Sequence, residues 1–134
     1  MQFAYGFLAD AVQTSNDGKF NVLGGGFESI FVREFPTAHP VMGLFVKIDV
    51  LPAECDKPHD LKIELWDPDG TLVQRLEGQF TASPSGDRLR QSHVQVAWGL
   101  LQTRFTAPGD YAFHVMVDGE HIGKVPLAVV QVSG

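Results

Sequence analysis

The sequence predicts an all-β fold: a single domain over residues 1–134, built as an antiparallel β-sandwich of about eight or nine strands. Three observations lead to this prediction. Apolar and polar residues alternate with period two along most of the chain, turn sequences separate the alternating runs, and no segment has a helical period long enough to connect parallel strands. A chain of 134 residues is also about the length of one domain.

The clearest alternating run begins at Met42, where even positions are apolar through Val50 while odd positions include Lys47 and Asp49. Such a strand is half-buried, with one face toward the core. Four later runs have the same period, at residues 61–65, 72–80, 94–100 and 111–117.

Compact turn sequences lie between these runs: NDG at residues 16–18, DPDG at 67–70, SPSGD at 83–87, APGD at 107–110 and DGE at 118–120. Proline presets φ at one turn position, and glycine supplies a positive φ at another. The spacing is that of hairpins, which favours antiparallel pairing.

Three consecutive glycines, Gly24 to Gly26, interrupt a strand-like run and raise the question of a phosphate-binding loop. A Walker-type loop needs a lysine after its last glycine and a helix beyond it. Here Phe27 and Glu28 follow, and the pattern is that of a strand. We therefore expect a kink, with a positive φ or a bulge at one glycine at least, where the chain changes direction or sheet between residues 19–23 and 27–31.

The stretch PGDYAFHVMVDGEHIGKVPLAVVQV, residues 108–132, resembles the closing hairpin of immunoglobulin-like domains, and especially of filamin-type repeats. Those repeats have a Pro-Gly-x-Tyr start, a Gly-containing turn, and an Ile four residues before a Pro-aromatic pair. The corresponding residues are Tyr111, Gly119, Ile122, Pro126 and Leu127, with Leu127 in place of the usual Phe. The resemblance implies an immunoglobulin-like sandwich and puts Tyr111 at the tyrosine corner, with its ring in the core and its hydroxyl bonded to backbone near the turn.

Over nearly its full length the chain resembles a small family of uncharacterised bacterial proteins, a domain of unknown function. The motifs that carry this likeness are LADAVQTSNDGKFNVLGGGF at residues 8–27, HPV at 39–41, LWDPDG at 65–70 and VDGEHIGKVPLAV in the closing hairpin. The resemblance implies a cytoplasmic bacterial protein and brings no activity with it.

Composition argues against several classes of protein. The formal charge is −6 and the 10 basic residues are scattered, whereas a nucleic-acid binder needs a basic face. The single cysteine, Cys55, cannot form an intramolecular disulfide, so a reducing, cytoplasmic location is expected. The apolar start MQFAYGFLADAV lacks a basic n-region and is too short for a membrane span, so no membrane insertion is expected.

Asp67 and Asp69 suggest a calcium site, because loops at one end of a β-sandwich can gather several carboxylate ligands. Asp87, Asp110 or Asp118 could join them. The competing interpretation is a type I turn with Asp, Pro and Gly at its first, second and fourth positions, which accounts for each residue without a metal. The sequence favours the turn, and calcium or small-ligand binding by the Asp-rich loops is the alternative function.

No zinc site is predicted, because the histidines lack metal-ligand spacing and a cysteine pair. The histidines are His39, His59, His93, His114 and His121. His114 is expected on the strand face opposite Tyr111, an ordinary place for a lone imidazole. Cys55 and His59 share a loop without the strand-to-helix elbow that exposes a nucleophile, so no catalytic pair is predicted.

The N-terminal strand is apolar on both faces, with Phe3, Tyr5 and Phe7 on one and Gly6 and Leu8 on the other. Both faces of such a strand must be covered, so the second face needs either an additional element of the same chain or a second subunit, and no amphipathic helix is evident to cover it. An edge strand also offers open backbone groups. We therefore expect a homo-oligomer, most simply a two-fold dimer, with residues 3–12 in its contact.

Together these observations predict a non-enzymatic interaction or structural module with an unknown protein partner and no cofactor. Nucleic-acid binding by the aromatic stripe of the first strand is not expected, because no Lys or Arg is interleaved with it. A hydrolase is the third alternative, and it would need a concave pocket with a perturbed carboxylate or histidine.

Overall fold

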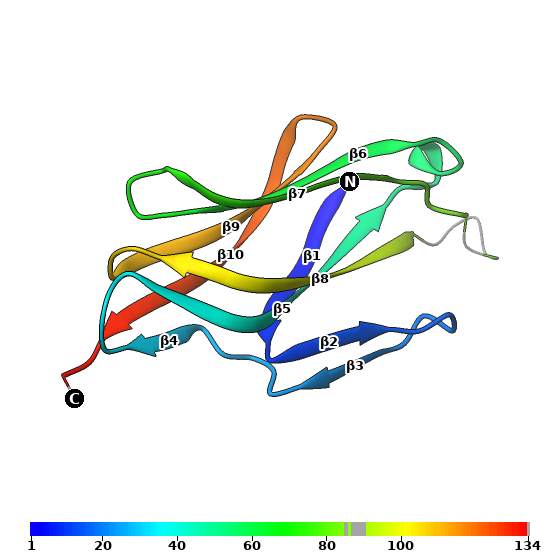
Figure 1. Ribbon diagram of the computed structural model, residues 1–134. Coiled ribbons are helices and arrows are strands. Elements are labelled where there is room, and N and C mark those ends of the chain that lie inside the picture. The colour runs from blue at the N-terminus through cyan, green and yellow to red at the C-terminus, as the bar shows by residue number, and fades with distance from the viewer. Residues whose placement is uncertain (85, 87–90, 134) are drawn as a thin grey trace.

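The computed structural model of the chain is all-β, and it describes residues 1–84, 86 and 91–133. The described residues form ten strands in three sheets, rather than about eight or nine strands (Figure 1). Their one helical element is a 3-10 turn, η1 (Pro52–Glu54).

The two larger sheets pack face to face. The three-stranded sheet has the order β1-β5-β8, with β1 (Gln2–Ala9), β5 (Thr37–Val50) and β8 (Ser92–Phe105). The five-stranded sheet has the order β4-β10-β9-β6-β7, with β4 (Ser29–Val32), β10 (Glu120–Gln131), β9 (Gly109–Val117), β6 (His59–Trp66) and β7 (Leu72–Phe80). The third sheet is the hairpin of β2 (Ala11–Thr14) and β3 (Phe20–Leu23).

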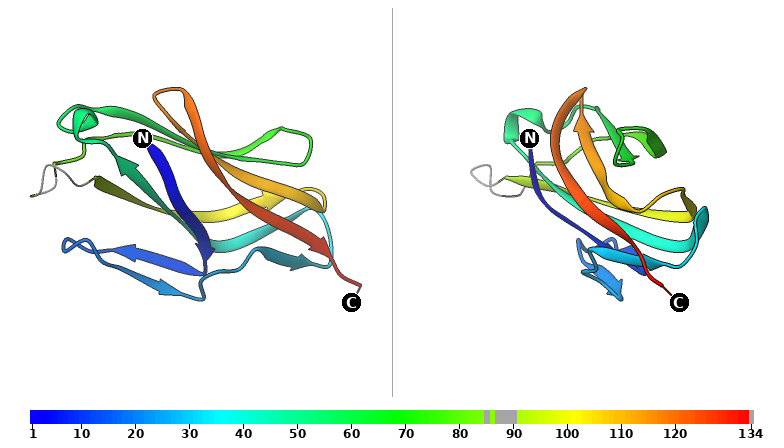
Figure 2. Two further views of the ribbon diagram at one scale, coloured as in Figure 1. Left: turned by 180° about the vertical axis from the view of Figure 1, so that it is seen from behind. Right: turned by 90° about the vertical axis from the view of Figure 1, so that its left-hand side faces the viewer.

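One pairing departs from the predicted antiparallel arrangement. β4 runs parallel to β10, with Ile30 opposite Val129. The expectation of a wholly antiparallel sandwich is therefore wrong at this edge. The five-stranded sheet is also strongly curled, as the end-on view in Figure 2 shows.

The core lies between the two larger sheets, and the predicted alternation is confirmed there. Even positions of β5 and odd positions of β6, β9 and β10 point inward. The buried core includes Leu44, Val46, Ile48, Ile63, Leu65, Phe113, Val115 and Leu127. Each buried side chain of this kind contributes roughly 1.5–3 kcal/mol to folding.

The alternation in β8 breaks at Gln102. Gln102 has a φ of 51°, a left-handed conformation that is uncommon for residues other than glycine. Leu100 is buried before this residue, and Thr103 and Phe105 are buried after it. The two faces of the strand therefore exchange at Gln102, while the register with β5 is the same on both sides of it.

The β2–β3 hairpin covers the outer face of the three-stranded sheet, where it lies below β5 in Figure 1. The ring of Phe20 lies 4.3 Å from that of Phe45, which also stacks on Phe7 at 5.1 Å. Phe45 is 0% exposed as a result. The N-terminal strand thus finds cover for this face within the same chain, which is the first of the two alternatives that the sequence left open.

The three glycines lie where the chain leaves this hairpin and joins the five-stranded sheet. Gly24 and Gly26 have φ values of 61° and 86°. The predicted kink between two sheets is confirmed, because β3 pairs with β2 whereas β4 pairs with β10.

Tyr111 occupies the predicted corner: its ring is buried, and its hydroxyl donates to the carbonyl oxygen of Ala107 at 2.7 Å. Near the other end of β10 the two larger sheets meet where β1 packs against it. Glycines allow this close approach, because a methyl group at Gly6 would meet Val125 and one at Gly123 would meet the ring of Phe3.

Candidate functional site

The outer face of the five-stranded sheet, the face away from the core, carries rows of charged and aromatic side chains. One row crosses four strands, because Glu64 lies opposite both Arg75 and His114, and His114 lies opposite Lys124. Arg75 holds the buried carboxylate of Glu64 through two nitrogens, at 2.6 and 2.8 Å from the same oxygen, Oε2.

A groove of about 610 Å³ lies on the same face, next to this row. Its lining residues are Asp60, Leu61, Lys62, Glu77, Gly78, Gln79, Met116 and Gly119. Gln79 donates to Asp60 at 2.9 Å, and Lys62 lies 4.0 Å from Glu77. The lining is thus of mixed charge and internally paired, and it holds no histidine.

His114 and His121 meet at the far side of this face. Nδ1 of His114 lies 2.9 Å from Nε2 of His121, and the His114 ring lies over Trp66 with their centroids 4.0 Å apart. Burial lowers the pKa of His114, and the neighbouring His121 and Lys124 lower it further. His114 is where the sequence predicts, but it is not a lone imidazole.

A bulge in β10 explains why the sequence did not predict the second member of this pair. Strict alternation would put His121 on the core side with Val125 and Leu127. The register shifts between His121 and Gly123, so His121 lies opposite Met116 on the outer face.

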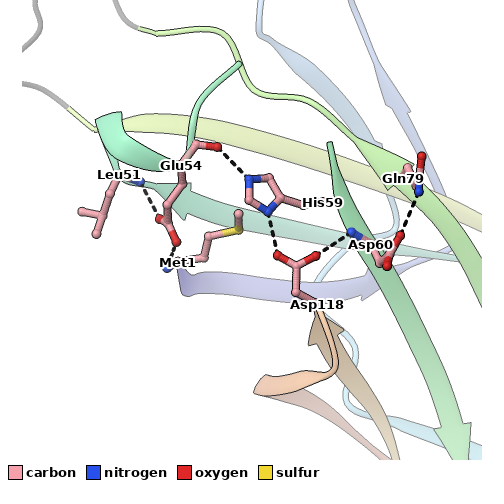
Figure 3. Close-up of polar contacts among 7 residues, drawn as sticks. All are labelled: Met1, Leu51, Glu54, His59, Asp60, Gln79 and Asp118. Atoms are coloured by element: carbon pink, nitrogen blue, oxygen red, sulfur yellow. Dashed lines mark hydrogen bonds and ion pairs between the residues drawn. The ribbon is translucent and has the colours of Figure 1, made fainter. Parts of the chain in front are cut away.

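His59 lies in a second polar cluster, at the start of β6 (Figure 3). The ring is 6% exposed. Its Nδ1 lies 2.7 Å from Oδ2 of Asp118, and its Nε2 lies 2.7 Å from the carbonyl oxygen of Glu54. Both partners are acceptors, so both ring nitrogens donate and the imidazole is charged.

Asp118 holds this charge in place from the β9–β10 turn. Its other carboxylate oxygen accepts the backbone N–H of Asp60 at 2.9 Å. The hydrogen bond from Asp118 raises the pKa of His59, and the Glu54 carbonyl adds to the effect. With both nitrogens engaged, His59 ties the loop after β5 to the β9–β10 turn.

The same loop carries Cys55, which is buried. Its Sγ lies 3.6 Å from Ser92 Oγ and 3.6 Å from the carbonyl oxygen of Leu51. The contacts of His59 are with Asp118 and the Glu54 carbonyl instead. Glu54 accepts the Leu51 N–H at 2.9 Å and lies 3.0 Å from the amino group of Met1.

The Asp67–Gly70 loop is the predicted turn. Oδ1 of Asp67 accepts the backbone N–H groups of Asp69 at 2.9 Å and Thr71 at 2.8 Å, and the carbonyl of Asp67 accepts the N–H of Gly70 at 3.0 Å. Asp110 lies in β9, Asp118 belongs to the His59 cluster, and Asp87 is outside the described residues. Across residues 1–84, 86 and 91–133, no three His, Cys, Asp or Glu side chains are arranged to hold a metal ion.

The remaining histidines lie apart from these clusters. His39 is in β5, and His93 in β8 bonds to Asp49 through Nδ1 at 2.7 Å. Tyr5 and Phe7 lie on the covered face of the three-stranded sheet, and Lys47 lies over the Tyr5 ring at 5.6 Å. The register of β1 shifts between Phe3 and Tyr5, so Phe3 packs against the core, and the prediction that all three rings share one face is wrong at Phe3.

The outer edge of β8 is the second surface of functional interest. β8 ends the three-stranded sheet, so in the described part of the chain no strand pairs with its other side. From Val94 to Thr103 it contains no charged residue and no proline. Leu101 is 66% exposed beside Val41, which is 50% exposed.

Among the described residues, no helix is long and apolar enough to cross a membrane.

Comparisons with known proteins connect the chain to a family. A search of the curated proteins finds no match. Among solved structures, a Pseudomonas fluorescens alkylpurine DNA glycosylase, AlkC, bound to DNA containing an abasic site analog, is similar with a TM-score of 0.42 and 16% identity. That match covers 76% of this chain and only 27% of the other. The model of a family of unknown function, DUF6941, matches residues 4–130, and the chain therefore belongs to this family.

Proposed function

We propose that this protein is a non-catalytic interaction module of the cytoplasm, an immunoglobulin-like sandwich that binds a protein partner by adding a strand to the outer edge of β8. The observation that carries the proposal is the long uncharged edge from Val94 to Thr103. Open strand edges pair readily with other chains, and β-strand addition is a recurrent mode of peptide recognition.

The character of this edge supports the proposal. Sheet proteins ordinarily protect long edges with charges, proline, bulges or a covering segment. β8 has its one left-handed residue at Gln102, beyond most of the open stretch. The apolar pair Val41 and Leu101 adds exposed contact area at the same end of the strand.

Three further features support a module of this kind without catalysis. His59 has both ring nitrogens occupied, and Cys55 contacts Ser92 rather than a histidine. The closing hairpin and the Tyr111 corner support the immunoglobulin-like assignment. The single cysteine supports a reducing compartment.

Calcium binding is the weaker alternative, because the Asp67 carboxylate already accepts two backbone N–H groups. A homo-oligomer stays a prediction, and a second copy pairing its own β8 is one form that the partner can take.

Two glycines provide a matched test. Gly99 in β8 and Gly78 in β7 both lie on strands that end a sheet, and an added side chain meets nothing within 4 Å at either. Gly99→Lys places a positive charge on β8, the proposed binding edge. Gly78→Lys places the same charge on β7, the edge strand of the five-stranded sheet. We expect affinity purification from the native host to recover one partner with the parent and with Gly78→Lys, and to lose it with Gly99→Lys.

Sedimentation equilibrium of the purified protein tests the second copy as partner. If the parent is a dimer and Gly99→Lys is a monomer, the partner is a second copy of this chain. Gly99→Thr, which is uncharged and favours strands, should retain binding in either assay. Equal recovery of the partner with Gly99→Lys and the parent would refute the edge as the binding surface.

A further inference from the structure

We propose that His114 and His121 form a chelating site for a divalent transition-metal ion, of which Cu²⁺ and Ni²⁺ are the best suited. The proposal is independent of the β8 edge. It rests on the contact between two imidazoles from neighbouring strands on the outer face of the five-stranded sheet.

The separation of the two nitrogens fits a particular coordination geometry. Metal–imidazole bonds are about 2.0–2.1 Å long, so two imidazoles at adjacent corners of a square or octahedron have nitrogens about 2.9 Å apart. Tetrahedral angles would require about 3.3 Å. Nδ1 of His114 and Nε2 of His121 are 2.9 Å apart. Tetragonal nitrogen sites are characteristic of Cu²⁺ and Ni²⁺.

Neighbouring side chains restrict the ring of His114 and leave the ring of His121 free to rotate. His114 is half-buried, and its ring lies against Trp66 with a centroid distance of 4.0 Å. His121 is exposed, so its ring can turn until both lone pairs point at one ion. A metal ion would then replace the hydrogen bond that the two rings share, since each metal-bound nitrogen must be deprotonated.

The charges beside the pair are balanced. Glu64 lies next to His114 on β6, and Lys124 lies next to it on β10. Arg75 binds the Glu64 carboxylate, so this carboxylate is not counted as a metal ligand. Its negative charge still favours a cation nearby. Two protein ligands leave the other positions on the ion to water.

Trp66 provides a direct readout. The chain contains 2 tryptophans, Trp66 beside His114 and Trp98, whose ring packs against Phe113 in the core. We expect Cu²⁺ to quench the fluorescence of the parent protein in a saturable manner at one equivalent. Ni²⁺ should compete for the site. Trp66→Phe should lose the quenched component.

Variants separate the pair from other sites that bind copper. His121→Ala should weaken Cu²⁺ binding by at least about tenfold, since removal of even a supporting residue weakens metal sites on that scale. His93→Ala removes another exposed histidine and should leave the titration unchanged. His121 is exposed, so its variant should keep the parent's melting temperature and circular dichroism spectrum. The proposal is overturned if parent and His121→Ala titrate alike, or if quenching never saturates.

Discussion

The outer faces of the two larger sheets differ in how far they are covered by other parts of the chain. On the three-stranded sheet, the β2–β3 hairpin covers Phe7 and Phe45, so the part of the face beneath the hairpin is apolar and closed. On the five-stranded sheet the face is open and polar, with a groove, an Arg75–Glu64 pair and two histidines. The comparison teaches that one face stabilises the fold and the other is free to bind, and the following predictions test this division.

The covered face should be far more sensitive to truncation than the open one. Phe45→Ala removes a fully buried ring from contact with Phe7 and Phe20, and should lower the free energy of unfolding by about 3–5 kcal/mol. Lys62→Ala on the open face should change it by less than about 0.5 kcal/mol. Urea denaturation of both variants measures the difference, and similar losses would remove the distinction between the faces.

Substitution in the Gly24–Gly26 segment, which follows the β2–β3 hairpin, should give the next largest loss of stability. A side chain at Gly24 would be strained by its φ of 61° and would also meet the carboxylate of Asp10. Gly24→Ala should therefore cost about 1–2 kcal/mol in unfolding free energy. Gly78→Ala, at an open position without a positive φ, is the control and should leave the midpoint almost unchanged. A Gly24→Ala variant as stable as this control would show that the corner tolerates a side chain.

The His59–Asp118 contact should make stability depend on pH. The pKa of His59 is raised above its ordinary value of 6.5, so its stabilisation is complete below about pH 6.5 and is lost as pH rises through the raised value. The pKa of Asp118 is lowered, so its stabilisation is present above about pH 4 and is lost only in stronger acid.

Melting temperatures of the parent and Asp118→Asn between pH 4 and 9 test this linkage. The parent should exceed the variant most between about pH 4 and 6.5, and the gap should shrink at alkaline pH. Asp49→Asn, which alters the more exposed His93 contact, serves as control. A gap that widens with rising pH would mean that His59 is neutral in the folded protein.

The Asp67–Gly70 turn, which joins β6 and β7 of the open sheet, should respond least. Millimolar calcium should leave the melting temperature unchanged, because a ligand that binds the folded state alone must raise it. An increase of several degrees that is reversed by a chelator and abolished by Asp69→Asn would instead establish calcium binding by this loop.

Local patterns predicted much of this fold. Alternation identified the core faces of β5, β6 and β9, and the residue types of the turn identified the Asp67 loop. The hydrogen bond of Tyr111 was expected from the resemblance of the closing hairpin to immunoglobulin-like domains. The glycine run was correctly interpreted as a change of sheet. In each case the physical cause lies within a few neighbouring residues, where a sequence pattern can record it.

The features that were not predicted depend on contacts distant in sequence or on bulges. No sequence pattern near residue 59 predicts its hydrogen bond to Asp118. Likewise, no pattern in β4 predicts that this strand pairs in parallel with β10. The bulge at residues 121–123 reverses the parity that strict alternation would give His121. The hairpin over Phe45 was missed because a covering helix was sought, while β2 and β3 are short strands.

The contact between β1 and β10 has a consequence for biosynthesis. Phe3 settles against Gly123, so a ribosome must add almost the whole domain before the first strand can reach its final neighbour. Until then Phe3 lacks this contact and remains available to chaperones and to other nascent chains. Because such distant pairings must close large loops, folding should be slow for a domain of this size, on the order of milliseconds to seconds.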